Sequence, residues 1–214
     1  MKKNLLLFLA IAVLFAGCQS KEEKAAELIK EELSKTLLDF ESYQPIETTV
    51  KEAKLNLYND TTFWRQGTAL AYAMKKTNEY INKKKDAEER MNIWGPPTYY
   101  SSSYSDKRYY EYKKEYDEAN ASALSGIILC KAIAENIKDS IEKCDTSIVI
   151  GWEVSHRFRC KNRGGNSTIA DYRYVIDKDL KTILLREDTD DQDDKNTRDA
   201  LETVLSGYWD NILN

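Results

Sequence analysis

Residues 147–187 read SIVIGWEVSHRFRCKNRGGNSTIADYRYVIDKDLKTILLRE, and they indicate the fold more directly than any other part of the chain. Over positions 147–161, apolar side chains and one histidine occupy every second position, and mostly polar side chains lie between them. Successive side chains of a β-strand point to opposite faces, so the alternation predicts one buried and one solvated face. The predicted buried set is Ile148, Ile150, Trp152, Val154, His156, Phe158 and Cys160.

Two more strands follow in the same stretch. Residues 162–166 contain two glycines and two asparagines, which tolerate the backbone of a tight turn. The alternation resumes over 168–176, a second turn is expected at 177–181, and residues 183–185 form a short third strand. The pattern predicts an antiparallel meander with a single apolar face, which needs helices to cover it.

Helical periodicity dominates most of the remaining chain. Apolar residues at three- and four-residue spacing predict helices over 24–40, from Asp60 or Thr61 to about Arg90, over 109–144 and over 197–212. Residues 46–50 favour extended structure, and residues 99–106 a loop. We therefore expect an α+β fold, an antiparallel three- to four-stranded meander covered on one face by long helices, forming a single domain over 25–214.

The N-terminus has the features of an export signal. Lys2 and Lys3 precede an uncharged apolar run over 5–15, whose eleven residues are too few to span a bilayer. The run ends Leu14-Phe15-Ala16-Gly17-Cys18. This ending resembles the lipobox of bacterial lipoproteins, with Phe15 in place of the usual leucine. The resemblance implies removal of residues 1–17, lipid on Cys18 and a tether over 18–24; the alternative is a plain secretory signal.

Further short segments resemble the same kind of protein. Gln19-Ser20-Lys21-Glu22-Glu23 resembles the surface-export signal of Bacteroidota lipoproteins, although the charged start of a helix would also explain it. Segments 39–48 and 156–162 resemble small, functionally uncharacterised outer-membrane lipoproteins of these bacteria. The resemblance implies a lipid anchor in the outer membrane, facing the cell surface or the periplasm, and it implies no activity.

The charge balance bears on the class of partner. The formal net charge of the full sequence is -4. Removal of the signal takes away Lys2 and Lys3, so the net charge of the remaining chain is -4 - 2 = -6. A nucleic-acid-binding surface needs a concentrated basic field, so we expect no nucleic-acid partner. We also expect no cofactor.

His156 is the single histidine and the natural starting point for an acid–base site. On the predicted strand, Cys160 lies about 13 Å away, too far to act as its nucleophile. The competing interpretation is a half-buried histidine bonded to a tyrosine or a backbone carbonyl. One histidine and scattered cysteines also lack the paired spacing of a zinc site.

An acidic stretch offers weak calcium-ligand spacing. The acidic positions are Asp188, Asp190, Asp194 and Asp199, interleaved with Gln192 and Asn196. These residues match the ligand positions of a calcium loop, but Asp193 stands where the loop needs glycine. A solvated acidic loop leading into a helix N-terminus explains the stretch without a metal.

Tyrosine clusters between 99 and 116, and we expect two environments there. Tyr109, Tyr112 and Tyr116 fit the apolar stripe of a helix, whereas Tyr99, Tyr100 and Tyr104 fall in the expected loop. Exposed tyrosines suit a glycan or an envelope protein as ligand. A second candidate surface is the solvated strand face, with Arg157, Arg159, Lys161, Arg163 and Arg173, which we expect to form cross-strand ion pairs rather than an anion site.

Two functions compete at this point. The favoured one is a lipid-anchored, non-enzymatic binding or scaffold module acting through Tyr99, Tyr100 and Tyr104. The alternative is an envelope hydrolase or transferase with an active site near His156. The spacing of Cys130, Cys144 and Cys160 along predicted elements further predicts that these thiols stay unpaired.

Overall fold

The computed structural model describes residues 19–211. Cys18 and the predicted signal peptide lie outside the described residues. The chain divides into two compact units, where the sequence led us to expect one domain. Residues 19–55 and 147–190 form the sheet unit, and residues 56–146 and 191–211 form the helical unit.

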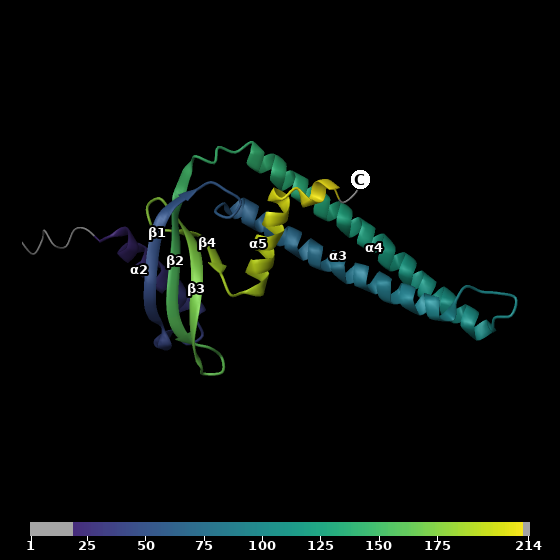
Figure 1. Cartoon of the computed structure of the whole chain (residues 1–214). Helices are drawn as coiled ribbons and strands as arrows, with labels where there is room; N and C mark the ends of the chain where they lie inside the picture. The colour runs from purple at the N-terminus through teal and green to yellow at the C-terminus, as the bar shows by residue number, and fades with distance from the viewer. Residues whose placement is uncertain (1–18, 212–214) are drawn as a thin grey trace, which may run out of the picture. The chain divides into compact units, whose positions relative to one another are not determined.

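The sheet unit contains the predicted antiparallel meander. Its strands are β1 (Gln44–Lys54), β2 (Val149–Lys161), β3 (Ser167–Asp177) and β4 (Ile183–Asp188). They lie in the order β1-β2-β3-β4, and every neighbouring pair is antiparallel (Figure 1). β1 extends beyond the predicted residues 46–50, because its backbone pairs with β2 from Gln44 opposite Arg159 to Lys54 opposite Val149.

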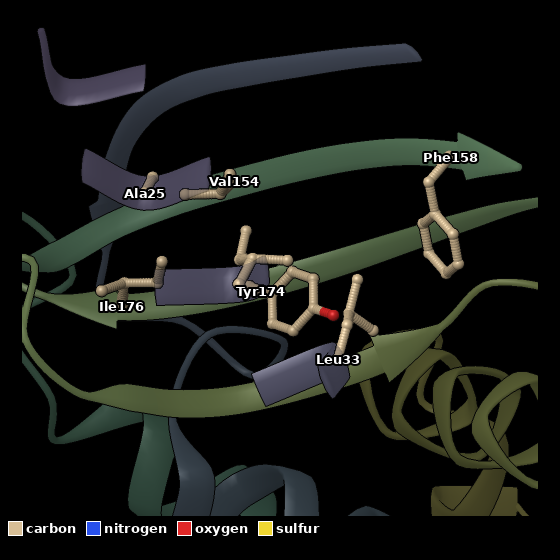
Figure 2. Close-up of a cluster of buried hydrophobic side chains, with 7 residues drawn as sticks. Ala25, Leu33, Val154, Phe158, Tyr174 and Ile176 are labelled. Carbon is tan, nitrogen blue, oxygen red and sulfur yellow. The ribbon is translucent and has the colours of Figure 1, made fainter. Parts of the chain in front are cut away.

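One helix covers the apolar face of this sheet. α2 (Lys21–Thr36) buries Ala25, Ile29 and Leu33 in a shared core whose strand residues are Val154, Phe158, Tyr174 and Ile176. Figure 2 shows these strand side chains pointing toward α2. The α+β class is confirmed, and the apolar face is confirmed at Val154, His156 and Phe158. Ile148, predicted to be buried, is 48% exposed because it precedes β2. The covering helix has 16 residues, and the longer helices belong to the other unit.

The ends of α2 differ from the predicted range of 24–40. Ser20 and Glu23 form a capping box, with Ser20 Oγ accepting from the Glu23 backbone N–H at 3.1 Å, so the helix begins at Lys21 inside the expected tether. The Lys21 ammonium lies 3.6 Å from the centroid of the Trp152 ring, which ties the first turn to β2. After Thr36 the chain is extended at Leu37 and then forms a 3₁₀ helix, η1 (Phe40–Ser42).

The helical unit is built on a long antiparallel hairpin. α3 (Thr61–Trp94) and α4 (Ser103–Glu142) lie side by side in Figure 1, joined by residues 95–102. Asp60 is the N-cap of α3, as predicted, and its carboxylate accepts from the backbone N–H groups of Thr62 and Phe63 at 2.8 and 3.1 Å. The predicted stripe of α4 is confirmed at its buried positions Ala119, Ala123, Cys130, Ala134 and Ile137.

Two further helices, α4 and α5, also begin earlier than predicted. α4 begins at Ser103 rather than at Tyr109, because Ser102 accepts the backbone N–H of Ser105 as its N-cap. α5 (Gln192–Leu205) begins five residues before the predicted Thr197, because Asp191 caps it. Leu201 and Val204 of α5 are buried as expected, and a 3₁₀ helix, η2 (Tyr208–Asn211), follows. Leu205 and Tyr208 are 60% and 54% exposed and do not belong to the buried stripe.

The cysteine prediction is confirmed. Cys130 is buried, Cys144 and Cys160 are partly buried, and all three are free thiols. Among residues 19–211, no helix is long and apolar enough to cross a membrane.

Candidate functional site

The tyrosines singled out in the sequence lie at the end of the α3–α4 hairpin, which we call the hairpin tip (residues 93–108). α3 ends at Trp94 because Gly95 adopts a φ of 65°, a left-handed value that favours glycine. Pro96 and Pro97 then prevent the helix from resuming. The chain returns into α4 at Ser103, so both ends of the tip are fixed by helices.

Tyr99 and Tyr100 are the most exposed large side chains of the tip. Their exposed fractions are 95% and 93%, and the two rings meet edge to face with centroids 5.3 Å apart. An aromatic ring buries a large area when it is covered, and the phenol adds a hydroxyl that can donate or accept. The pair therefore presents apolar faces and two hydroxyl groups to any ligand that approaches the tip.

Tyr104 is in the first turn of α4 rather than in the loop, and it belongs to a separate cluster. Its ring meets Trp94 edge to face at a centroid distance of 5.6 Å, and the Arg108 guanidinium lies 5.5 Å from its centroid. Arg108 Nε donates to the Tyr104 hydroxyl at 3.3 Å. Arg108 Nη1 also donates to the Glu111 carboxylate at 2.9 Å, so its charge is paired within α4, and contacts with Tyr104 and then Glu111 raise the pKa of Arg108 above its usual range. Tyr104 remains 57% exposed.

Polar contacts of Ser101 order the segment that carries Tyr99 and Tyr100. Its hydroxyl donates to the Thr98 carbonyl at 2.8 Å and accepts from the Thr98 backbone N–H at 3.0 Å. The same hydroxyl also bonds to the carboxylate of Asp106 in α4. These contacts hold the loop against the first turn of α4, so less conformational entropy has to be lost when a ligand binds.

The sequence did not reveal every member of the tip. Trp94 lies beyond the helix predicted to end near Arg90, yet in the structure it is the last residue of α3 and packs on Tyr104. Arg108 lies between the predicted loop over 99–106 and the predicted helix start at Tyr109, and Ile93, 78% exposed, also lies beyond the predicted helix end. The signal that could have found them is the i, i+4 spacing of Tyr104 and Arg108, which places the two side chains on one side of a helix.

His156 is a core residue in the structure. It is 1% exposed, and its Nε2 and Nδ1 atoms lie 2.8 and 2.9 Å from the hydroxyls of Tyr43 and Thr48. Its ring also stacks on Tyr43 and Phe158. Burial lowers the pKa of His156 to about 4, so the imidazole is neutral near pH 7. The predicted bond to a tyrosine is confirmed, and both ring nitrogens meet hydroxyl groups.

The acidic residues of the calcium hypothesis are spread over the end of β4, the turn after it and α5. Asp191 caps α5 by accepting from the backbone N–H groups of Asp193 and Asp194 at 2.8 and 3.2 Å. Asp188, at the end of β4, accepts from the Asp190 backbone N–H at 3.0 Å, and Asp199 lies within α5. Within residues 19–211, no group of three or more His, Cys, Asp or Glu side chains could hold a metal ion.

The polar face of the sheet forms the cross-strand pairs that the sequence predicted. Arg157 lies opposite Asp171 with their charged atoms 3.6 Å apart, and Arg173 Nε donates to Glu187 at 2.5 Å. Arg173 and Glu187 are 8% and 3% exposed, so the expectation of a solvated face is wrong at this pair. Arg157, Asp171 and Arg173 line a hollow of about 370 Å³ together with Glu47, Thr49, Ser155, His156, Tyr172 and Thr189.

Comparisons with known proteins add no further information about this site. No protein-family model, no curated protein and no solved structure matches the chain. The assignment of a function therefore depends on the geometry of the described residues.

Proposed function

We propose that this chain is a lipid-anchored, non-enzymatic recognition module of the bacterial cell envelope, with the hairpin tip as its binding element. The observation that carries the proposal is the exposure of Tyr99 and Tyr100 at 95% and 93% on an ordered loop. Large aromatic side chains on folded proteins are usually at least partly covered, and exposed ones concentrate at binding surfaces.

The chemistry of the tip fits a glycan or an envelope protein. Tyrosine rings stack on the apolar faces of sugars or on aliphatic side chains, and their hydroxyls bond to polar groups of either ligand. Arg108, which is ion-paired with Glu111 at 2.9 Å, adds guanidinium N–H groups next to Tyr104. Both aromatic clusters are held by helices or by Ser101, so the surface is available without rearrangement.

The site around His156 supports the non-enzymatic part of the proposal. A general acid or base needs a pKa near the working pH and access to substrate. The His156 ring is 1% exposed, its pKa is about 4, and Tyr43 and Thr48 occupy its ring nitrogens. These properties are those of a neutral core side chain.

The anchoring part rests on the sequence before Cys18 and is tested separately. Replacement of Cys18 with serine should leave the signal unprocessed and release any mature chain from membranes. Membrane association of a processed Cys18→Ser chain would contradict the lipid anchor without bearing on the hairpin tip.

The binding part is tested with a matched pair of variants. The intact protein and the double variant Tyr99→Ala/Tyr100→Ala are applied to a glycan array and to solubilised envelope proteins. We expect the double variant to lose at least about tenfold in affinity for the ligand found, since interface tyrosines commonly contribute more than 1 kcal/mol. Tyr208→Ala, which removes a 54% exposed tyrosine of η2 outside the tip, should bind like the parent. Equal binding by parent and double variant, or turnover that depends on His156, would overturn the proposal.

A further inference from the structure

The middle of α4 is apolar on sides that face away from its partner helix. Residues 119–130 contain no charged side chain. Ala123 and Cys130 face α3 and are buried, whereas Leu124, Ile128 and Leu129 are 49%, 59% and 54% exposed. A helix that is apolar on all sides is normally covered on all sides, so this face lacks the partner that its composition calls for.

A shallow groove runs beside this exposed face. It has a volume of about 620 Å³ and lies between α3 and α4, and its lining includes Tyr72, Ala73, Ser122, Ser125 and Leu129. Small side chains form its floor because the helices approach closely at Gly126, where an added Cβ would lie 2.3 Å from Thr77 Oγ1. The helical unit therefore carries a ridge, Leu124 and Ile128, next to a groove of matching chemistry.

We propose that this face binds a second copy of the same chain, with the two α4 helices antiparallel about a two-fold axis at Leu124. In such an isologous contact each copy supplies the same surface, so Leu124 meets the other copy's Leu124, with Ile128 of each copy beside them. The seam on α4 is defined by Lys113, Asp117, Leu124, Ile128, Lys131 and Glu135, whose spacing places them along one side of the helix.

The charges at the two ends of this seam favour a second copy over an unrelated partner. Asp117 and Lys131 each lie seven residues from Leu124, one on either side, and Lys113 and Glu135 each lie eleven residues from it. An antiparallel pair centred on Leu124 therefore places Asp117 opposite the other copy's Lys131, and Lys113 opposite its Glu135. In a parallel pair, each charge would face its own like.

The ion pairs already present within α4 are compatible with this arrangement. Lys113 Nζ lies 3.1 Å from an Asp117 oxygen, and Lys131 Nζ lies 4.0 Å from a Glu135 oxygen. The dimer would join each pair to its counterpart about 10 to 17 Å from the two-fold axis. Alternating charges across the junction form a four-membered network, which stabilises more than isolated surface pairs do.

Single cysteines in the full chain test the geometry directly. Leu124→Cys lies on the axis, so its two copies should form a disulfide on mild oxidation and give a covalent dimer on a non-reducing gel. Tyr110→Cys is the matched control, because Tyr110 is 58% exposed and lies on the same helix, fourteen residues from the axis. Its two copies would be about 42 Å apart and should not cross-link. The unsubstituted chain measures the background from its native cysteines.

Each outcome decides the proposal. Cross-linking of Leu124→Cys alone supports the antiparallel dimer; cross-linking of both variants overturns it in favour of a parallel pair. Cross-linking of neither variant, or of Tyr110→Cys alone, overturns the proposal. As a further test, Asp117→Lys should lower the dimer fraction in sedimentation equilibrium at least severalfold, and Asp117→Lys combined with Lys131→Asp should restore it. A dimer that is unchanged by Asp117→Lys, in a chain of unchanged helicity, would overturn the charge assignment.

Discussion

Tyrosine has opposite environments in the two units. In the sheet unit, Tyr174 is fully buried, and Tyr172 packs edge to face on Phe158 with ring centroids 5.1 Å apart. In the helical unit, Tyr99 and Tyr100 are 95% and 93% exposed. The difference follows from what lies over each ring: α2 covers the apolar face of the sheet, whereas the hairpin tip extends past its own helices. Tyr172 and Tyr174 thus help to hold one unit together, whereas Tyr99 and Tyr100 remain available for contacts on the other.

The comparison predicts the largest effect in the sheet core. Phe158→Ala should lower the free energy of unfolding by about 3–5 kcal/mol, because it removes a fully buried ring that contacts Tyr43, His156 and Tyr172. Chemical denaturation followed by circular dichroism measures the change. Phe158→Leu, which keeps most of the buried volume, should recover more than half of the loss; a change below about 1 kcal/mol in Phe158→Ala would contradict the core assignment.

The buried histidine should make stability depend on pH. The pKa of His156 is about 4 in the folded chain and near 6.5 when unfolded, so the unfolded state binds a proton first as the pH falls. The stabilisation is complete above pH 6.5 and is lost between pH 6.5 and 4, about 3 kcal/mol in all. Denaturation midpoints of parent and His156→Gln between pH 7 and 5, above most carboxylate titration, isolate this contribution. Parallel profiles for the two proteins would show that His156 does not titrate in this way.

The close packing of α3 and α4 at Gly126 predicts an intermediate effect on the free energy of unfolding, and its sign should depend on the residue at position 77. Gly126→Ala places a Cβ 2.3 Å from Thr77 Oγ1, whose hydroxyl donates to the Ala73 carbonyl at 2.8 Å. We expect a loss of about 1–2 kcal/mol in unfolding free energy. In a Thr77→Ala background the 2.3 Å contact is removed and the Cβ of residue 77 remains at 3.1 Å, a contact that a shift of a few tenths of an ångström relieves. The same substitution should then stabilise by up to about 1 kcal/mol through helix propensity. The same sign in both backgrounds would refute the close approach.

The smallest effect on stability is expected at the hairpin tip. Tyr99→Ala and Tyr100→Ala should each change the free energy of unfolding by less than about 0.5 kcal/mol, because neither ring is packed in a core. Thermal melts of the two variants and the parent measure this. A loss above about 1.5 kcal/mol in either variant would place the ring in a core and remove the contrast between the two units.

Much of the fold was predictable where local patterns and caps are strong. The alternation over β2 and the glycine-rich turn after it fixed the meander, and Asp60 marked the start of α3. The second half of β1 was not predictable, because Lys51, Glu52 and Ala53 suit a helix as well as a strand. Pairing with β2, a segment far away in the sequence, decides their conformation.

Only those parts of the candidate site that have a local sequence pattern were predictable. The proline pair and the tyrosine density located the loop with Tyr99 and Tyr100. The cluster of Trp94, Tyr104 and Arg108 depends on α4 starting at Ser103, and a run of three serines offers several equivalent caps. The residues of α4 that face away from α3 could not be identified from the sequence, because residues 119–130 carry no charged side chain on any side of the helix.

The position of the helical hairpin in the chain affects the order in which the sheet forms. β2 and β3 are joined by a turn of five residues, 162–166, whereas β1 and β2 are separated by the 94 residues 55–148. Loop closure over the longer segment costs about 3 kcal/mol more entropy than over the shorter one, so the meander of β2, β3 and β4 should assemble before β1 joins it. Until then the free edge of β2 is open to pairing with another chain. The folding time of the inserted helices therefore limits how long a newly made molecule is exposed to aggregation through β2.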